Sequence, residues 1–193
     1  MASEITLSLL VGTLTPTPAP REVMEALTQV EVRSSAQDRS GFDLTFALSK
    51  RSAIVTRLLP SGYFDPPTRI IITVTVKGQA TVLMDGVITH QELVPSDESG
   101  RSVLSVKGED LTRMMDLIDF SGFPFPGMPA EVRVALMVAK YLPLYKIVPL
   151  IMPSVLVDVP NPLDEIPGQR GTDLNYIKML ADNVGYVFYL QPG

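Results

Sequence analysis

The strongest constraint on the fold is an alternation of apolar and other residues at every second position. In the stretch 42–48 the apolar positions are Phe42, Leu44, Phe46 and Leu48. Because successive side chains of a strand point to opposite faces of a sheet, this pattern predicts a half-buried strand. Residues 69–77 alternate in the same way and end at a turn, Lys77-Gly78-Gln79, before a long apolar stretch from Thr81 to Val94. These two stretches predict a β-hairpin.

The apolar parity changes inside the stretch 81–94, where Asp85-Gly86 stands. A glycine at such a point is typical of a β-bulge, which bends a strand. Residues 101–107 predict a third strand of a meander, and residues 6–11 predict a short strand near the start of the chain. We therefore expect an antiparallel, strongly curved sheet or a small β-barrel.

Prolines mark the connection after the first strand. The alternating prolines of residues 15–20 enforce an extended path, and this stretch is either a connector or a ligand for a proline-recognition domain. A connector is the favoured interpretation, because such motifs are common in linkers. Pro20 suits the first turn of a helix, so residues 21–27 predict a short one.

Helical spacing begins after the meander. Gly108-Glu109-Asp110 is suited to cap a helix over residues 111–118, whose apolar residues fall on one face. A second helix is expected from Pro129 to about Leu142, and its few charges predict burial on most sides. Residues 147–151 and 154–159 are apolar runs bounded by prolines, which restricts them to edge or irregular strands.

The last segment predicts a helix, a tight turn and a strand. Thr172 is a good N-cap, and apolar residues recur at helical spacing from Leu174 to Val184. Gly185 suits the left-handed residue that ends a helix, and residues 186–190 then predict a buried strand. The whole chain is accordingly expected to be an α+β protein, with a β-barrel domain over residues 1–108 and a helix-containing segment over residues 109–193.

Composition excludes several classes of protein. The formal charge of −5 and the pI near 4.9 argue against nucleic-acid binding, which normally needs clustered Lys and Arg. Without cysteine the chain has neither a disulfide scaffold nor a thiolate metal site. The first residues lack the basic region of a signal peptide, and residues 5–11 are too short to insert into a membrane. We expect assembly in the cytoplasm.

The sequence contains few groups that could act in catalysis. His90 is the only histidine, and a Gly-x-Ser-x-Gly elbow and Gly-rich phosphate loops are absent from the sequence. A pair of acids is the remaining route to hydrolysis, for example of cell-wall glycan. The candidate carboxylates are Asp85, Glu92, Asp97, Asp116, Asp119, Asp158 and Asp164. They stand mostly at expected turns, so we predict a protein that is not an enzyme and needs no cofactor; a β-rich glycan-binding module is a further alternative.

The amino-acid sequences of four segments resemble those of one protein family. These segments are Gly41 to Phe46, Val82 to Ile88, Gly108 to Leu111 and, most distinctively, Gly171 to Tyr189. They are similar, in this order, to segments of contractile tail hub proteins, which include phage late-control hub proteins and the hub portion of type VI secretion spikes. Extracellular contractile injection systems derived from phages are the most similar branch.

The resemblance implies a structural role at the end of an inner tube. Hub proteins form homotrimers whose barrels offer a pseudo-sixfold face to the hexameric tube protein and meet the trimeric spike protein on the other side, among other baseplate proteins. Since such hubs continue into a second barrel, we expect this chain to be the first part of a longer hub in a phage tail-like particle. Family barrels use the equivalents of strands 69–77 and 81–93 to line the tube. The implied interface residues are Arg69, Ile71, Thr73, Thr75, Val87, Thr89, Gln91 and Glu92.

Overall fold

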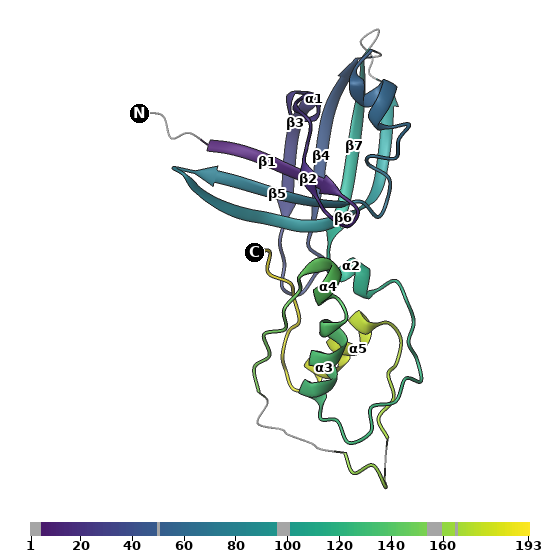
Figure 1. The fold of residues 1–193 in the computed structure, drawn as a ribbon. Coiled ribbons are helices and arrows are strands. Elements are labelled where there is room, and N and C mark those ends of the chain that lie inside the picture. The colour runs from purple at the N-terminus through teal and green to yellow at the C-terminus, as the bar shows by residue number, and fades with distance from the viewer. Residues whose placement is uncertain (1–4, 50, 96–100, 154–159, 165) are drawn as a thin grey trace. The chain divides into compact units, whose positions relative to one another are not determined.

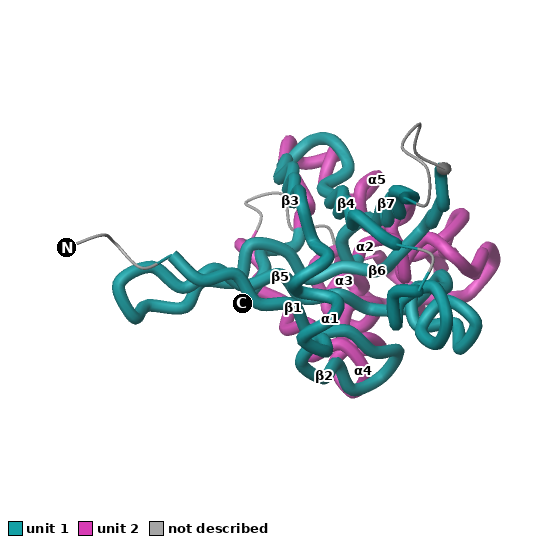
Figure 2. Tube along the Cα trace, turned by 90° about the horizontal axis from the view of Figure 1, so that it is seen from above, with its two compact units in different colours: residues 1–111, 190–193 teal, residues 112–189 magenta. Residues whose placement is uncertain are grey.

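The computed structural model describes residues 5–49, 51–95, 101–153, 160–164 and 166–193. The chain divides into two compact units, Met1–Leu111 with Leu190–Gly193 (unit 1) and Thr112–Tyr189 (unit 2), which have different colours in Figure 2. Unit 1 contains all the described strands, and unit 2 contains most of the helices (Figure 1).

Unit 1 is built on one antiparallel sheet of seven strands. They are β1 (Ile5–Gly12), β2 (Thr17–Pro18), β3 (Leu27–Arg33), β4 (Gly41–Ser49), β5 (Arg69–Val76), β6 (Gln79–Pro95) and β7 (Arg101–Asp110). In space their order is β2-β1-β5-β6-β7-β4-β3. This arrangement confirms the α+β class and the curved antiparallel sheet. Among the described residues β2 and β3 do not pair with each other, so the sheet is open and does not close into the barrel that was the other expectation.

Strand β6 carries the bend of the sheet. It pairs with β5 over residues 79–87 and with β7 over residues 86–95. It therefore belongs to both halves of the sheet, β2-β1-β5 on one side and β7-β4-β3 on the other. The bulge predicted at Asp85-Gly86 is wrong in position, because the extra residues are Leu83, opposite β5, and Thr89, opposite β7. Gly86 has another purpose: a Cβ there would collide with the carbonyl oxygen of Glu109. The glycine permits close approach of two backbones where the halves meet.

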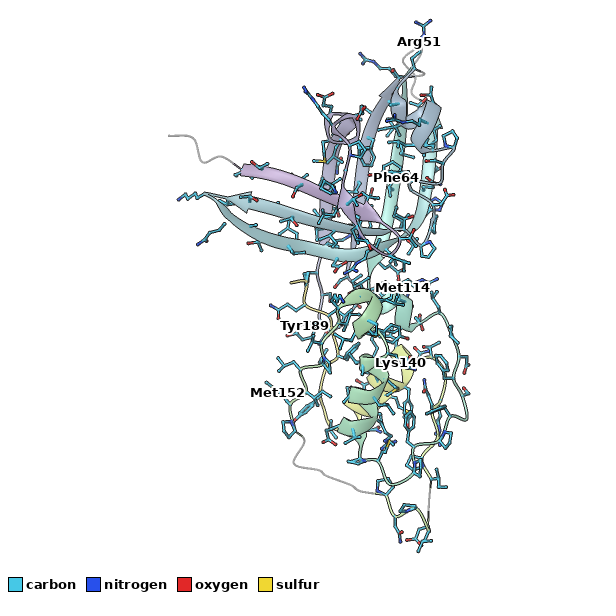
Figure 3. All side chains as sticks on the ribbon, viewed as in Figure 1. Arg51, Phe64, Met114, Lys140, Met152 and Tyr189 are labelled. Atoms are coloured by element: carbon cyan, nitrogen blue, oxygen red, sulfur yellow. The ribbon has the colours of Figure 1, made fainter. Side chains whose placement is uncertain are left out.

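The core of unit 1 follows the alternation in the sequence. All four apolar residues of the stretch 42–48 are buried, as predicted. Two short helices pack on the same core, α1 (Arg21–Ala26), which begins after Pro20 as predicted, and the π-helix η1 (Ile54–Leu58). Phe64, labelled in Figure 3, follows η1 and lies 5.3 Å from Phe46 between ring centroids. Because the sheet supplies only one layer, these helices and Phe64 complete the burial of its apolar face.

Unit 2 packs short helices around a small core. The helices are α2 (Thr112–Met115), α3 (Ala130–Ala139), α4 (Leu142–Tyr145) and α5 (Asp173–Asp182). The core cluster of this unit consists of Phe125, Met137, Val138, Tyr176, Ile177 and Leu180. Pro129 precedes α3 as predicted, but the helix ends at Ala139. One side of α3 remains at the surface of this unit, so the predicted burial on most sides is not met within the unit itself.

Helix α2 is much shorter than the helix predicted over residues 111–118. The expected cap, Gly108-Glu109-Asp110, instead extends β7, where it pairs with β4 and β6. The backbone is therefore committed to the sheet until residue 110, and only one helical turn follows. Ile118, expected on the buried face, is 60% exposed.

Helix α5 begins and ends as the sequence predicts. The Thr172 hydroxyl accepts a hydrogen bond from the Asn175 amide at 3.3 Å, which is an N-cap. At the other end Gly185 has a φ of 72°. The amide of Tyr186 donates to the carbonyl of Ala181 at 2.9 Å, which closes a Schellman motif.

The strand predicted over residues 186–190 does not form. Within the part of the chain that the structure describes, this segment pairs with no strand, and Val187 and Tyr189 are more than half exposed. Residues 147–151 are likewise irregular, whereas the run 154–159 lies outside the described residues. Tyr189 lies in the segment 186–190, and Met152 directly follows the segment 147–151 (Figure 3). A strand needs a partner to satisfy its backbone, and these segments have none among the described residues of unit 2.

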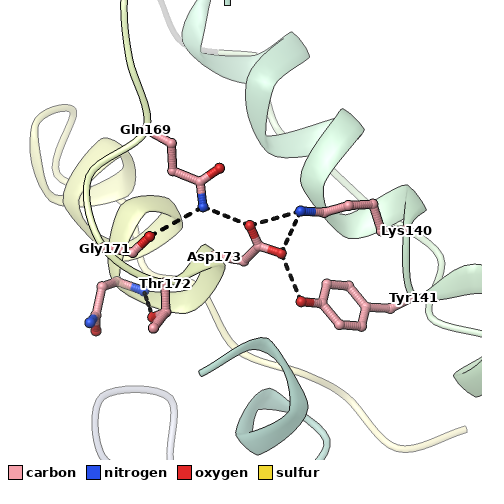
Figure 4. A network of polar contacts seen from close by, with 7 residues as sticks. Lys140, Tyr141, Gln169, Gly171, Thr172 and Asp173 are labelled. Carbon is pink, nitrogen blue, oxygen red and sulfur yellow. Dashed lines mark hydrogen bonds and ion pairs between the residues drawn. The ribbon is translucent and has the colours of Figure 1, made fainter. Parts of the chain in front are cut away.

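A buried carboxylate connects α5 to α3 (Figure 4). Asp173 is fully buried and accepts hydrogen bonds from Lys140 Nζ at 2.9 Å, Tyr141 Oη at 2.7 Å and Gln169 Nε2 at 2.7 Å. Burial of the phenol and the nearby Asp173 raise the pKa of Tyr141. The Lys140 ammonium also lies 4.1 Å from the ring centroid of Phe120. No local pattern in the sequence indicates this network, because its members are far apart along the chain.

Candidate assembly interface

Three strand segments of unit 1 extend past the core as an arm (Figure 1). We define the arm as residues 5–8 of β1, 73–76 of β5 and 79–83 of β6. Strand β2 pairs with β1 only at Leu10 and Val11, and β7 joins β6 only from Gly86 onward. Over the length of the arm, both outer strands therefore have open edges among the described residues.

The two faces of the arm differ in polarity. On one face the apolar row of β1 and β5 continues from the core toward the tip, and exposure rises from 2% at Leu9 to 67% at Ile5. The opposite face carries hydroxyl groups, from Thr6 and Ser8 on β1 and from Thr73 and Thr75 on β5. The arm thus offers an apolar face with little cover and an uncharged polar face.

Charge is almost absent from the arm. Lys77 at the hairpin tip is the only charged residue in the stretches 5–12 and 70–84. Edge strand β3, by contrast, carries Glu31 and Arg33 and has a register irregularity near Thr28. Charges and bulges are the devices that keep an exposed strand from pairing with another chain. The β3 edge has these devices, and the open β1 edge does not.

The implied interface residues fall into two groups. Ile71, Thr73 and Thr75 lie on the hydroxyl-bearing face of β5, partly exposed. Arg69 shares this face but is only 7% exposed, because its Nε and Nη2 bind both carboxylate oxygens of Asp85 at 2.7 and 2.6 Å. Val87, paired with Arg69, is also buried. A charge reversal at Arg69 would therefore disrupt this bidentate pair inside the unit, whatever its effect on assembly.

The other three implied residues lie on the second half of β6, beside β7. Thr89 occupies the bulge, Gln91 donates to Asp65 Oδ1 at 2.5 Å, and Glu92 is exposed with its carboxylate 4.0 Å from His90 Nε2. The structure thus does not join all eight residues in one surface. Residues 5–8 of β1 were missed, although the absence of charge from Ile5 to Gly12 was the signal that marks them.

The candidate catalytic groups are dispersed. His90 is exposed, and its Nε2 lies 4.0 Å from the Glu92 carboxylate. Asp85 is held by Arg69, Asp116 accepts from the Thr172 hydroxyl at 2.8 Å, and Asp164 accepts from the Asn161 amide. Asp97 and Asp158 lie outside the described residues.

Asp119 also has a local structural role. Its carboxylate accepts a hydrogen bond from the Ser121 amide at 2.7 Å, and hydrogen bonds with Ser121 lower the pKa of Asp119. A general acid for glycoside hydrolysis needs a raised pKa, so this carboxylate is unsuited to that task. Asp85, Asp116, Asp119 and Asp164 thus each have a local structural partner.

Two further observations concern other kinds of site. Over the described ranges, no three His, Asp or Glu residues come together as metal ligands, and no helix is both long and apolar enough to span a bilayer. A glycan-binding face would need exposed aromatic rings along a strand. The aromatic side chains on the described strands are Phe42 and Phe46, and both are buried. The glycan-binding alternative gains no support from them.

Solved structures with the same fold include two tail proteins. The tail protein from Neisseria meningitidis MC58 matches with a TM-score of 0.55 at 16% identity, over 96% of this chain and 48% of that protein. The 43 kDa tail protein of prophage MuSo2 from Shewanella oneidensis matches with a TM-score of 0.50 at 17% identity, over 93% of this chain and 51% of that protein. This chain spans about half the length of each.

Comparisons of sequence alone find no relative: neither a protein-family model nor a curated protein matches the chain. The match to each tail protein covers nearly the whole of the present chain, and so it includes both units. It agrees with the resemblance to tail hub proteins that the sequence segments carry. The chain therefore has the fold of these two tail proteins.

Proposed function

We propose that this chain is a structural component of a phage-type tail or contractile injection machine, in which three copies form a ring. The ring joins the hexameric inner tube to the trimeric spike, next to other baseplate proteins. The protein assembles in the cytoplasm and then becomes part of a tail-like particle. It acts through shape and interfaces, without catalysis or a cofactor, and residues 1–108 form its ring domain.

The observation that carries this proposal is the arm. It leaves two open, almost uncharged strand edges and an apolar face at the surface of a protein that shares its fold with tail proteins. An unprotected edge of this kind is a template for strand pairing. Since β1 and β6 lie on opposite sides of β5, the two open edges point in opposite directions, as neighbours in a ring require.

This geometry sharpens the expected interface. Ile71, Thr73 and Thr75 remain candidates, and the open edges add Thr6 and Ser8 to them. Arg69 and Val87 support the arm from inside the unit, because their side chains are buried.

The oligomeric state of the full chain tests the proposal. We expect native mass spectrometry to find a trimer that also joins tube and spike proteins. A lysine on either open edge, Ser8→Lys or Ala80→Lys, should weaken the trimer about 100-fold, or about 2.7 kcal/mol, because it adds the charge that edges normally use against pairing. The matched control is Gln29→Lys on β3, which should leave the trimer intact.

Two outcomes would contradict the proposal. The first is a folded monomer at every concentration that binds neither tube nor spike protein. The second is a trimer that tolerates Ser8→Lys and Ala80→Lys as well as it tolerates Gln29→Lys, because the ring would then not be built on the arm.

A further inference from the structure

The hydrogen bonds around β1 show which of its backbone groups point outward at the open edge of the arm. The Leu9 carbonyl points away from β5, because it accepts a hydrogen bond from the Ala19 amide at 2.9 Å. In an antiparallel strand the amide and carbonyl of one residue point to the same side, and the side alternates from residue to residue. Ile5 and Leu7 therefore turn their backbone groups outward, whereas Thr6 turns its groups toward β5.

Strand β5 passes this alternation on to β6. Thr75 lies opposite Thr6, so its backbone groups bond to β1. Ala80, which lies opposite Thr75 on the other side, consequently points its amide and carbonyl away from β5. The same holds for Val82, two residues later and before the bulge. Each open edge of the arm thus presents two residues with outward backbone groups.

The direction of the two edge strands limits how copies can join. Both β1 and β6 run antiparallel to β5, so they run in the same direction as each other (Figure 1). A neighbour whose β1 lies parallel to β6 keeps its apolar face on the same side as that of the first copy. A neighbour turned to make this pair antiparallel places its hydroxyl-bearing face there instead. Only the parallel pair keeps one side of the joined sheet apolar, as burial of that side requires.

We propose that β6 of one copy pairs in parallel with β1 of a second copy along the arm, with Ala80 opposite Thr6. The inference rests on the proposed ring and names the edges on which the ring closes. The edges fit this occupant, because each presents two residues and neither stretch, 5–8 or 79–83, carries a charge that opposes pairing. Pairing of β1 with a second β1 would leave both β6 edges open, whereas head-to-tail pairing in a ring occupies every edge.

The register follows from the outward groups. With Ala80 opposite Thr6, the Ala80 amide donates to the Ile5 carbonyl of the second copy, and the Ala80 carbonyl accepts from the Leu7 amide. The Val82 amide then donates to the Leu7 carbonyl. A shift of two residues along β1 would direct the Val82 amide to the Leu9 carbonyl, which already accepts a hydrogen bond within its own chain.

The sequence contains no cysteine, so engineered cysteines report this pairing directly. Opposed residues of neighbouring strands are close enough for a disulfide, whereas β1 and β6 of one copy lie two strand spacings, or about 10 Å, apart. The double variant Thr6→Cys with Ala80→Cys should therefore form covalent trimers on oxidation, and each single variant should stay monomeric on a denaturing gel. The matched control is Thr6→Cys with Val82→Cys, whose Cα atoms would lie about 8 Å apart and which should cross-link about 10-fold more slowly.

Amide hydrogen exchange of the wild type gives a measurement that needs no variant. In the trimer the amides of Leu7, Ala80 and Val82 become donors to a neighbouring copy. They should exchange at least about 10-fold more slowly than in protein diluted to the monomer. The amides of β3 are the control and should exchange equally in both states.

Different outcomes overturn different parts of the inference. A wild-type trimer whose three amides exchange as fast as in the monomer would overturn the strand pairing and leave the ring intact, even if the cysteine variants fail to fold. Covalent dimers of Thr6→Cys alone would also overturn it, because two β1 edges would then meet about a twofold axis. Equal cross-linking of the test and control pairs would overturn the register. A wild-type protein that never assembles would instead contradict the proposed function.

Discussion

Units 1 and 2 reach a folded state by different means. In unit 1 seven strands satisfy one another's backbones, and the apolar residues fall on the buried face through a period of two. In unit 2 four short helices are joined by long irregular segments, and the fully buried carboxylate of Asp173 holds α3 against α5. The first unit therefore depends on a repeated local pattern, and the second depends on a few specific contacts.

This difference teaches where single substitutions should be most damaging. A sheet spreads its stability over many hydrogen bonds and a large apolar face, so one exposed change is tolerated. In a unit held by a buried polar network, much of the stability depends on a few residues, because each donor left without its acceptor is costly. Substitutions in the two units sharpen the contrast.

The largest effect is expected at Asp173. In Asp173→Ala, the Lys140 ammonium, the Tyr141 hydroxyl and the Gln169 amide lose an acceptor together. Lys140 is 43% exposed and can turn to water, but the Tyr141 hydroxyl and the buried Gln169 amide lose the same acceptor at once, so unit 2 should lose about 3 kcal/mol of stability. Hydrogen exchange and thermal unfolding of the full chain should show the loss in residues 112–189. Asp182→Asn, at the exposed end of α5, is the control and should stay within about 0.5 kcal/mol of the wild type. Equal effects of the two changes would remove the contrast between the units.

Unit 1 has its own weak point, at Gly108. A Cβ at this position would collide with the ring of Phe42 and with the carbonyl oxygen of Val87. Since Phe42 is 1% exposed and cannot move aside, Gly108→Ala should destabilise unit 1 by about 2 kcal/mol, measured by chemical unfolding. The control is Gly168→Ala in unit 2, where the nearest atom is 4.0 Å away and no penalty is expected. If Gly108→Ala were silent, the close packing of the sheet halves would not matter for stability.

The accuracy of the sequence predictions follows the same division. Strands 42–48, 69–77, 81–94 and 101–107 were predicted because their alternation is local. The bulge was misplaced, because Gly86 marks a close approach to a distant strand, which the periodicity of β6 itself does not reveal. In unit 2 the cap and end of α5 were predicted from Thr172 and Gly185, both local signals.

The contacts that hold unit 2 together could not be predicted in this way. Asp173 stands in the first turn of α5, where acids are common, and its partner Lys140 stands 33 residues earlier. The helix over residues 111–118 was overestimated because β7 takes residues 108–110 into the sheet. For the interface, the resemblance to tail hub proteins implied Ile71, Thr73 and Thr75, which stay predictions. The open edge of β1 became evident only from the strand order.

A smaller effect, and one that depends on pH, is expected at Tyr141. The folded state raises the pKa of this phenol above its ordinary value of 10.0, chiefly through burial and also through Asp173. Above pH 10 the unfolded chain releases the phenol proton while the folded chain keeps it, so stability declines as the pH rises through that region. Tyr141→Phe should lose about 1.5 kcal/mol at neutral pH, from the missing hydrogen bond to a charged group, and should show a flatter alkaline decline. An unchanged decline in denaturant midpoints between pH 9 and 11 would contradict this assignment.

The smallest effect is expected where the strand prediction was wrong. Val187 is 53% exposed and lies in a segment that pairs with no strand in the described structure, whereas Ile72, on β5, is fully buried. Val187→Ser should therefore change the stability of the isolated chain by less than about 0.5 kcal/mol, and Ile72→Val, which removes a single buried methylene, should cost about 1 kcal/mol. Thermal unfolding of both variants gives the comparison. A larger loss for Val187→Ser than for Ile72→Val would mean that residues 186–190 are buried in solution, and the contrast between a paired β5 and an unpaired terminal segment would fail.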